Sequence, residues 1–228
     1  MAMAIGHSVV AEPCPTGGLV DHALAYAALG WAVFPLRPKD KRPLIARDAG
    51  GRGCLDATTD QATIRGWWWR TPSANIGVAC GPSGIVVLDI DGEEGAGWLE
   101  QLIAEHDVLP DHPFSLTRSG GHVVFRSPPA VRIANAQGRP APKLDVRAAG
   151  GYIVAPPSIH PSGHVYCWEP GRSPWETAPP PMPGWLLGLV AANDNRAAAS
   201  SGAMSSRPDR RSRTEAGHGA TALHDACQ

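Results

Sequence analysis

The sequence predicts an α+β domain with mainly antiparallel sheets flanked by helices. Short apolar runs recur along the chain between turns that contain glycine or proline, which is typical of strands joined in hairpins. Helical spacing interrupts these runs at a few places but does not alternate with them regularly, which argues against a parallel sheet. With 228 residues, 43% of them hydrophobic, the chain is long enough for one domain of ordinary size with a tail.

The N-terminal part of the domain is predicted to contain two helices separated by a short strand. Residues 19–30 have helical spacing and end in Gly30, a suitable C-cap. Residues 31–35 are typical of a strand. Thr59-Asp60 can cap a second helix, which we expect to end before a proline at residue 72.

Three strand pairs are predicted in the middle of the chain, each around a short turn. The predicted pairs are 75–79 with 84–91 around residues 80–83, 114–117 with 122–125 around residues 119–121, and 144–147 with 152–154 around residues 148–151.

The remaining elements complete the domain and suggest its limits. Residues 93–106 have the spacing of an amphipathic helix, 165–168 of a further strand and 185–191 of a short helix. We therefore expect an N-terminal extension at 1–18 and one domain at 19–192. From residue 193 to 228 large apolar residues almost disappear, which is typical of a disordered tail.

Composition narrows the class of protein. The net charge of -1 means that any contact with nucleic acid must come from a local patch rather than from a basic surface as a whole. Five scattered cysteines form no C-x-x-C pair, which argues against a structural zinc site or a disulfide framework. No leader or membrane-spanning segment is evident, so we expect a cytoplasmic protein that has no contact with a membrane.

An apolar run that ends in two carboxylates is the strongest functional signal. In Gly84-Ile-Val-Val-Leu-Asp-Ile-Asp91 the alternation of a strand places Asp89 and Asp91 on the same face, about 7 Å apart at their backbones. A strand this apolar is expected in the middle of a sheet. Two carboxylates at its end repel each other unless a cation or hydrogen-bond donors lie between them. A divalent metal ion between the two carboxylates is the simplest way to offset this repulsion.

Two divalent ions, about 3.5–4 Å apart and bridged by carboxylates, are what nucleotidyl transfer requires. Asp89 and Asp91 can supply the paired ligands, and Asp145 follows an apolar residue in another short strand and can supply the third. Magnesium or manganese suits such a site, because these ions take oxygen ligands from a few carboxylates and from substrate phosphates. The predicted catalytic and metal-binding residues are therefore Asp89, Asp91 and Asp145.

A glycine turn and nearby basic residues are suited to phosphate. In Ser119-Gly120-Gly121-His122 the glycines let the backbone approach a ligand, and the hydroxyl and imidazole add donors. Arg147 shares a strand face with Asp145 and can clamp a phosphate through its planar guanidinium group. Lys41 and Arg42, in a turn-rich loop, are weaker candidates for contact with template or phosphates.

In their order along the chain, these motifs resemble those of the bifunctional DNA primase/polymerase (Prim-Pol) N-terminal domain, a branch of the archaeo-eukaryotic primase superfamily. The resemblance is carried by Asp89-Ile-Asp91, by Thr117-Arg-Ser-Gly-Gly-His122 and by the segment from Leu144 to Ser158. Flanking segments also resemble that family, over about residues 20–190. Each motif alone is weak, and the ordered set is specific.

The resemblance implies a fold, an activity and partners. The fold would be archaeo-eukaryotic primase-like, with an RRM-like core. The activity would be template-directed nucleotidyl transfer in the replication of a mobile element, with Asp89, Asp91 and Asp145 as metal ligands. Ser119 and His122 would hold the triphosphate of the incoming nucleotide. The expected partners are a single-stranded DNA template, nucleoside triphosphates and, unless the chain is a stand-alone remnant, a separate helicase.

Two other functions are open. The run ending in Asp-Ile-Asp-Gly92 also resembles the first motif of haloacid-dehalogenase-type phosphatases, in which Asp89 would be the nucleophile and Asp91 the general acid. Glu93 stands where that family has Thr or Val, and no Asp-Asp pair follows. The second alternative is a non-catalytic nucleic-acid-binding replication module that has kept the fold.

Structural roles compete with several of these interpretations. Arg147 can pair with Asp145 or Asp91 in a salt bridge rather than bind a ligand. The run Trp67-Trp-Trp69 could stack on bases, but its helical spacing favours core packing with one exposed ring. His160 and His164 lie in a proline-glycine turn, which argues against a zinc role.

Overall fold

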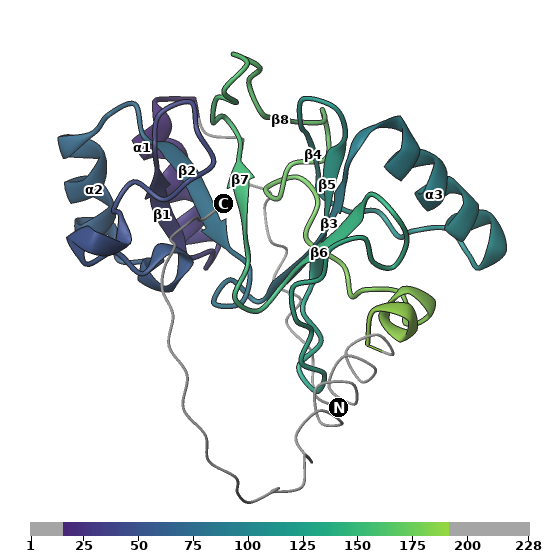
Figure 1. The fold of residues 1–228 in the computed structure, drawn as a ribbon. Helices are drawn as coiled ribbons and strands as arrows, with labels where there is room; N and C mark the ends of the chain where they lie inside the picture. The colour runs from purple at the N-terminus through teal and green to yellow at the C-terminus, as the bar shows by residue number, and fades with distance from the viewer. Residues whose placement is uncertain (1–15, 192–228) are drawn as a thin grey trace, which may run out of the picture.

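Two antiparallel sheets with helices against them make up the fold of this computed structural model, which confirms the predicted α+β class (Figure 1). The structure describes residues 16–191. The predicted tail at 193–228 and most of the predicted extension at 1–18 lie outside the described residues.

The smaller sheet has the strand order β1-β2-β7 and the larger one β6-β3-β5-β4-β8. The smaller sheet consists of β1 (Val33–Leu36), β2 (Asn75–Ala79) and β7 (Tyr152–Ala155). The larger sheet consists of β3 (Ile85–Ile90), β4 (Phe114–Leu116), β5 (Gly121–Arg126), β6 (Leu144–Arg147) and β8 (Cys167–Trp168). All neighbouring strands pair antiparallel. Along the chain, β1 and β2 enter the smaller sheet, β3 to β6 form most of the larger one, β7 returns to the smaller sheet and β8 completes the larger one.

Helices cover the outer sides of both sheets (Figure 1). Helices α1 (Leu19–Ala28) and α2 (Gln61–Arg70) pack with the smaller sheet, whereas α3 (Gly92–Glu105) and a helix at residues 184–191 pack with the larger one. Two short 3-10 turns, η1 (Arg47–Ala49) and η2 (Gly53–Asp56), lie in the loop before α2. Within residues 16–191 no helix has the length and apolar character needed to cross a membrane.

The capping residues predicted for the first two helices lie at the observed helix ends. The Asp60 carboxylate accepts a hydrogen bond of 2.8 Å from the backbone N–H of Thr63 and so caps α2. Gly30, with φ of 82°, adopts the left-handed conformation just after α1 ends, where a residue with a side chain would be strained. The cap at Asp60 and the conformation of Gly30 depend only on residues close in sequence, so the sequence alone predicts both.

One of the three predicted strand pairs is confirmed, and two are wrong. Strands β4 and β5 form a hairpin around residues 117–120. Strands β2 and β3 do not pair with each other, because residues 80–84 carry the chain from the smaller sheet to the larger one. Likewise β6 and β7 do not pair, because residues 148–151 carry it back. Glycine-rich turns permit both a hairpin and a crossover, so their residues alone do not decide between the two.

The two crossovers lie side by side. The backbone N–H of Cys80 in the first donates to the carbonyl of Gly151 in the second, at 2.9 Å. A Cβ added at Gly81 would lie 3.4 Å from the Cα of Ala149, so the two segments are nearly in van der Waals contact. The two segments that connect the sheets therefore lie against each other at one end of the cleft-forming strands.

The alternation predicted for β3 is confirmed. Val86, Leu88 and Ile90 belong to the core between the larger sheet, α3 and the helix at 184–191. Val87, on the opposite face, belongs to the core shared with the smaller sheet. Asp89 lies on the same face as Val87 and therefore points toward the space between the two sheets.

The tryptophan run also behaves as its spacing predicts. Trp68 is only 2% exposed, and its indole Nε1 donates to the carbonyl of Ala74 at 2.9 Å. Trp67 packs at the edge of the core, whereas Trp69 is 83% exposed.

Truncating a side chain in the core of the larger sheet should test this packing. Leu88→Ala leaves a cavity beside β5 and β6, so we expect the free energy of unfolding to fall by about 2 to 5 kcal/mol. Trp69→Ala removes an exposed ring and should change it by no more than about 0.5 kcal/mol. Urea unfolding of both variants measures the difference. Equal losses in the two variants would contradict the assigned core.

Candidate active site

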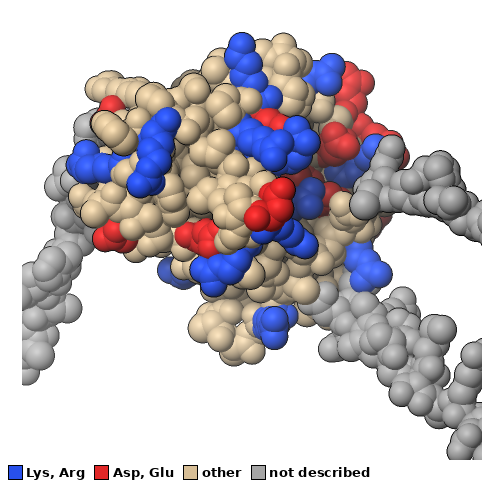
Figure 2. Space-filling model, turned by 60° about the vertical axis from the view of Figure 1, so that its left-hand side comes forward, with Lys and Arg blue, Asp and Glu red and all other residues tan. Residues whose placement is uncertain are grey.

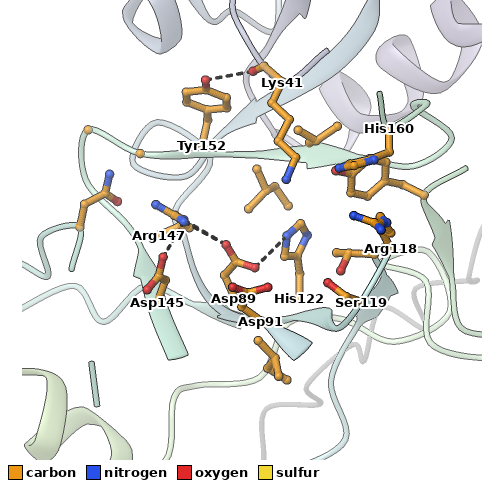
Figure 3. A pocket seen from close by; sticks show the side chains of 18 residues that line it. Lys41, Asp89, Asp91, Arg118, Ser119, His122, Asp145, Arg147, Tyr152 and His160 are labelled. Carbon is orange, nitrogen blue, oxygen red and sulfur yellow. Dashed lines mark hydrogen bonds and ion pairs between the residues drawn. The ribbon is translucent and has the colours of Figure 1, made fainter. Parts of the chain in front are cut away.

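A polar cleft of about 510 Å³ opens between the two sheets. Its floor comes from β3, β5 and β6 of the larger sheet, and β7 of the smaller sheet supplies the opposite wall together with the loop that carries Lys41. Figure 3 shows acidic side chains at the floor, with Lys41 reaching toward them from the other side. The volume lies within the range of about 300–1,000 Å³ that is usual for small-molecule sites.

Four polar side chains lie in one row across the larger sheet. The strand register places Ser115 of β4 opposite His122 of β5, His122 opposite Asp89 of β3, and Asp89 opposite Asp145 of β6. Directly opposite residues in an antiparallel pair have their side chains on the same face and close together. Two residues distant in sequence, Asp89 and Asp145, are thereby brought side by side.

A guanidinium group bridges this acidic pair and offsets part of its negative charge. Nη2 of Arg147 donates to Oδ2 of Asp89 at 3.0 Å and to Oδ2 of Asp145 at 2.8 Å (Figure 3). Asp145 also accepts a hydrogen bond from the backbone N–H of Gly138 at 2.8 Å. The sequence left open whether Arg147 pairs with Asp145 or Asp91; the structure shows it with Asp145 and with Asp89.

His122 contributes to the environment of Asp89. Its Nε2 lies 3.4 Å from Oδ1 of Asp89, and its Nδ1 lies 3.1 Å from Oγ of the buried Ser115. Burial alone would raise the pKa of Asp89. The hydrogen bond and positive charge of His122, together with those of Arg147, outweigh burial and lower that pKa to about 2. Asp89 is therefore ionised across the physiological range.

Asp91 is more exposed than the other two carboxylates and has a different partner. It is the N-cap residue of α3, one position beyond the end of β3, and its side chain is 66% exposed. Its carboxylate lies 3.7 Å from Nζ of Lys143, although Asp91 lines the same cleft. Within the part of the chain that the structure describes, no group of three or more acidic, His or Cys side chains is drawn together as a metal site.

The glycine turn is placed at the cleft, but its members differ in position. Ser119 and His122 line the cleft, whereas Gly120 and Gly121 pack behind it. A Cβ at Gly120 would lie 2.0 Å from the carbonyl oxygen of Ile90, and the N–H of Gly120 donates to Oγ1 of Thr117. The glycine therefore lets the turn lie directly against the end of β3.

Several cleft residues lie in segments that resemble the family but were assigned no role in the site from the sequence. Tyr152, His160 and Tyr166 line the cleft, and the ring of Tyr166 stacks near that of His122, with centroids 6.5 Å apart. Burial, followed by the charge of Asp89, raises the pKa of Tyr166 to about 12. Of the two basic residues suggested by the sequence, Lys41 lines the cleft, whereas Arg42 is exposed and pairs with Asp40.

The donor set of the cleft fits a divalent cation. Asp89, Asp91 and Asp145 line one cleft and offer hard oxygen ligands of the kind that Mg²⁺ and Mn²⁺ take. Arg147 already supplies positive charge between two of them, which shows that a cation is favourable at that position. The residues present therefore suit such an ion.

The surface shows no excess of basic side chains, as the net charge of -1 leads one to expect. On the face shown in Figure 2, basic and acidic side chains are interspersed, and no single broad basic area covers it. Any contact with a polyanion on this face must therefore be local.

A comparison with protein families matches residues 23–185 to the bifunctional DNA primase/polymerase, N-terminal. The match covers most of the chain, including both sheets and the whole cleft. The protein belongs to this Prim-Pol family, which confirms the resemblance seen in its motifs and the primase-like fold. No curated protein matches the chain.

Removing the guanidinium should change how stability depends on pH. Because the pKa of Asp89 is lowered from 3.8 to about 2, its ionised form stabilises the fold above pH 4, and this contribution disappears as the pH falls toward 2. Arg147→Gln should raise the pKa of Asp89 only in part, because His122 remains, and should lower the free energy of unfolding near pH 6 by about 1 kcal/mol. The loss should shrink as the pH approaches 2.

Urea unfolding between pH 2 and 6, with carboxyl NMR titration, measures both effects. Arg65→Gln, which removes an exposed arginine on α2, is the control and should show no such pH dependence. A loss that is the same at every pH in Arg147→Gln would contradict the pairing with Asp89.

Proposed function

We propose that this protein is a template-directed nucleotidyltransferase, a DNA primase/polymerase that acts in the replication of a mobile element. The observation that carries the proposal is the register of β3 and β6, which sets Asp89 opposite Asp145 on the floor of a cleft large enough for a nucleotide. Membership of the Prim-Pol family supports this activity.

In this proposal Asp89, Asp91 and Asp145 hold two divalent ions, Mg²⁺ or Mn²⁺. When bound, such ions make an attacking hydroxyl more acidic and offset the charge of departing pyrophosphate. Asp91, at the mouth of the cleft and largely exposed, can turn from Lys143 toward a bound ion with little change in burial. The low pKa of Asp89 keeps this ligand deprotonated.

The glycine turn binds the phosphates of the incoming nucleotide. Ser119 presents its hydroxyl at the cleft, and His122 is held by Ser115 and Asp89 in one orientation at the cleft wall. Gly120 and Gly121 keep the turn close to the end of β3, so that Ser119 and His122 stay near the carboxylates. Arg147, beside Asp89 and Asp145, can move its guanidinium group to a phosphate oxygen.

The partners in this proposal are a single-stranded DNA template and nucleoside triphosphates. A separate helicase would supply the opened template. The carboxylates and Arg147 orient the reacting groups, while the apolar cores on both sides of the cleft keep the two sheets in place.

Replacing either paired carboxylate should stop synthesis without unfolding the protein. We expect Asp89→Asn and Asp145→Asn each to lower incorporation of labelled nucleotide by at least about a hundredfold, since each removes a ligand for the charge-stabilising ions. The assay contains the purified protein, a single-stranded template, nucleoside triphosphates and Mg²⁺ or Mn²⁺. Glu100→Gln, an exposed carboxylate on α3, is the control and should retain the wild-type rate.

Assays with the same purified protein distinguish the polymerase from the two alternative functions. DNA binding by a wild-type protein that incorporates no nucleotide would indicate a non-catalytic binding module. Release of inorganic phosphate from monoesters, lost in Asp89→Asn, would indicate a phosphatase.

A further inference from the structure

The most exposed tryptophan ring lies on α2, outside the cleft. All eight tryptophans of the chain fall within residues 16–191, and Trp69 is the one among them whose side chain is largely in solvent. Its neighbours Trp67 and Trp68 pack against the core of the smaller sheet. The proposed function gives Trp69 no role. An indole that stays in water beside further apolar groups is typical of a surface that binds a partner.

A shallow groove of about 480 Å³ lies beside this ring. Gly66 leaves it open, because a Cβ at that position would meet only the end of the Arg70 side chain, at 4.0 Å. The α2 groove, as we name it, is lined by Val20, Arg65, Gly66, Trp68, Trp69 and Arg70. None of these residues lines the cleft, and Figure 1 shows α2 on the outer side of the smaller sheet.

Two arginines flank Trp69 along the helix. Arg65 lies one turn before it and Arg70 directly follows it, and both side chains are exposed. Among residues 16–191 no ion pair joins either of them to an acidic side chain. Helix α2 contains no acidic residue, and none lines the groove. The groove is therefore a local basic patch on a chain whose net charge is -1.

An aromatic face between two unpaired guanidinium groups matches the alternation of bases and phosphates in a single strand. Within residues 16–191 no other ring and no cation stacks on Trp69, so its face is available to a base. Stacking on an indole is tolerant of base sequence, and arginine binds phosphate oxygens. An acidic peptide would meet the charges but has no need of a planar ring.

We propose that the α2 groove is an accessory site for single-stranded DNA. A base stacks on Trp69, while Arg65 and Arg70 bind the phosphates on either side of it. This inference rests on the proposed function, to which it adds a contact with the template strand outside the cleft. The groove holds the strand by charge and stacking and takes no part in the chemistry.

Binding of a labelled oligothymidylate to the full chain, followed by fluorescence anisotropy, tests the site without any need for catalysis. Trp69→Leu keeps an apolar side chain but removes the aromatic face, so it should weaken binding about tenfold, the contribution of one stacked base. Trp69→Phe keeps a stacking face and should retain most of the affinity. Both changes concern an exposed ring, so the fold should stay intact.

The arginines are tested through the dependence of binding on salt. Arg70→Gln should lower the slope of log affinity against log salt concentration by about 0.7, the value for one phosphate contact in a single strand. Arg132→Gln makes the same change of charge at an exposed position between β5 and β6 that lines neither the groove nor the cleft. This control should leave both the affinity and the slope unchanged.

The emission of Trp69 reports stacking directly. Unlabelled oligothymidylate should quench part of the tryptophan emission of the wild type, and this quenching should be absent in Trp69→Phe although the DNA still binds. A saturating nucleoside triphosphate should leave the quenching in place, because the groove and the cleft share no lining residue.

The opposite results would overturn the accessory site. Equal affinity of the wild type and Trp69→Leu for DNA would show that no base stacks there. Equal loss in Arg70→Gln and Arg132→Gln would show only a general effect of charge. Weaker binding of polyglutamate by Trp69→Leu, with DNA binding unchanged, would assign the groove to an acidic protein.

Failure of the accessory site is distinguishable from failure of the polymerase. If DNA binding depends on Trp69 but the wild type incorporates no nucleotide, the accessory site stands and the proposed polymerase activity fails. If the wild type incorporates nucleotide while its DNA binding is insensitive to Trp69, the polymerase stands and the accessory site fails.

Discussion

The pairing of Asp89 with Asp145 is the constraint on which the rest of the cleft depends. Antiparallel register sets the two carboxylates side by side, and two negative charges in a half-buried position need a cation between them. Arg147, two residues beyond Asp145 on the same strand face, supplies it. Arg147 thus offsets the repulsion between Asp89 and Asp145 within the fold, so neutralising one acid removes a favourable contact as well as a repulsion. The pair for which the sequence predicted repulsion was Asp89 with Asp91.

The arrangement of the two sheets turns this pair into a cleft. The crossovers at residues 80–84 and 148–151 lie against each other and join the sheets at one end. The face of β3 that carries Asp89 therefore looks toward β7 and the Lys41 loop rather than toward open solvent. Acidic and basic groups from distant parts of the chain meet across this space.

Local patterns account for what the sequence could predict. Periodicity predicted the helices and the two faces of β3, and residue type predicted the cap at Asp60. The ordered motifs indicated Asp89 and Asp145, and strand alternation placed Arg147 on the face of Asp145. The pairing of β2 with β3 and of β6 with β7 was wrong, because turns around Gly81 and Gly150 are compatible with both hairpins and crossovers. Asn75 and His160 lie in segments that resemble the family, but their positions could not be inferred from the sequence. The contact that places Asn75 beside the segment of His160 joins residues 84 positions apart in the chain.

The most direct test of the account is to locate a divalent ion in a crystal of the protein grown with Mn²⁺ and a non-hydrolysable nucleoside triphosphate. Anomalous scattering should place manganese in contact with the carboxylates of Asp89 and Asp145, with the guanidinium of Arg147 displaced from between them. Manganese bound elsewhere, with Arg147 still bridging both carboxylates while nucleotide occupies the cleft, would contradict the role assigned to this pair.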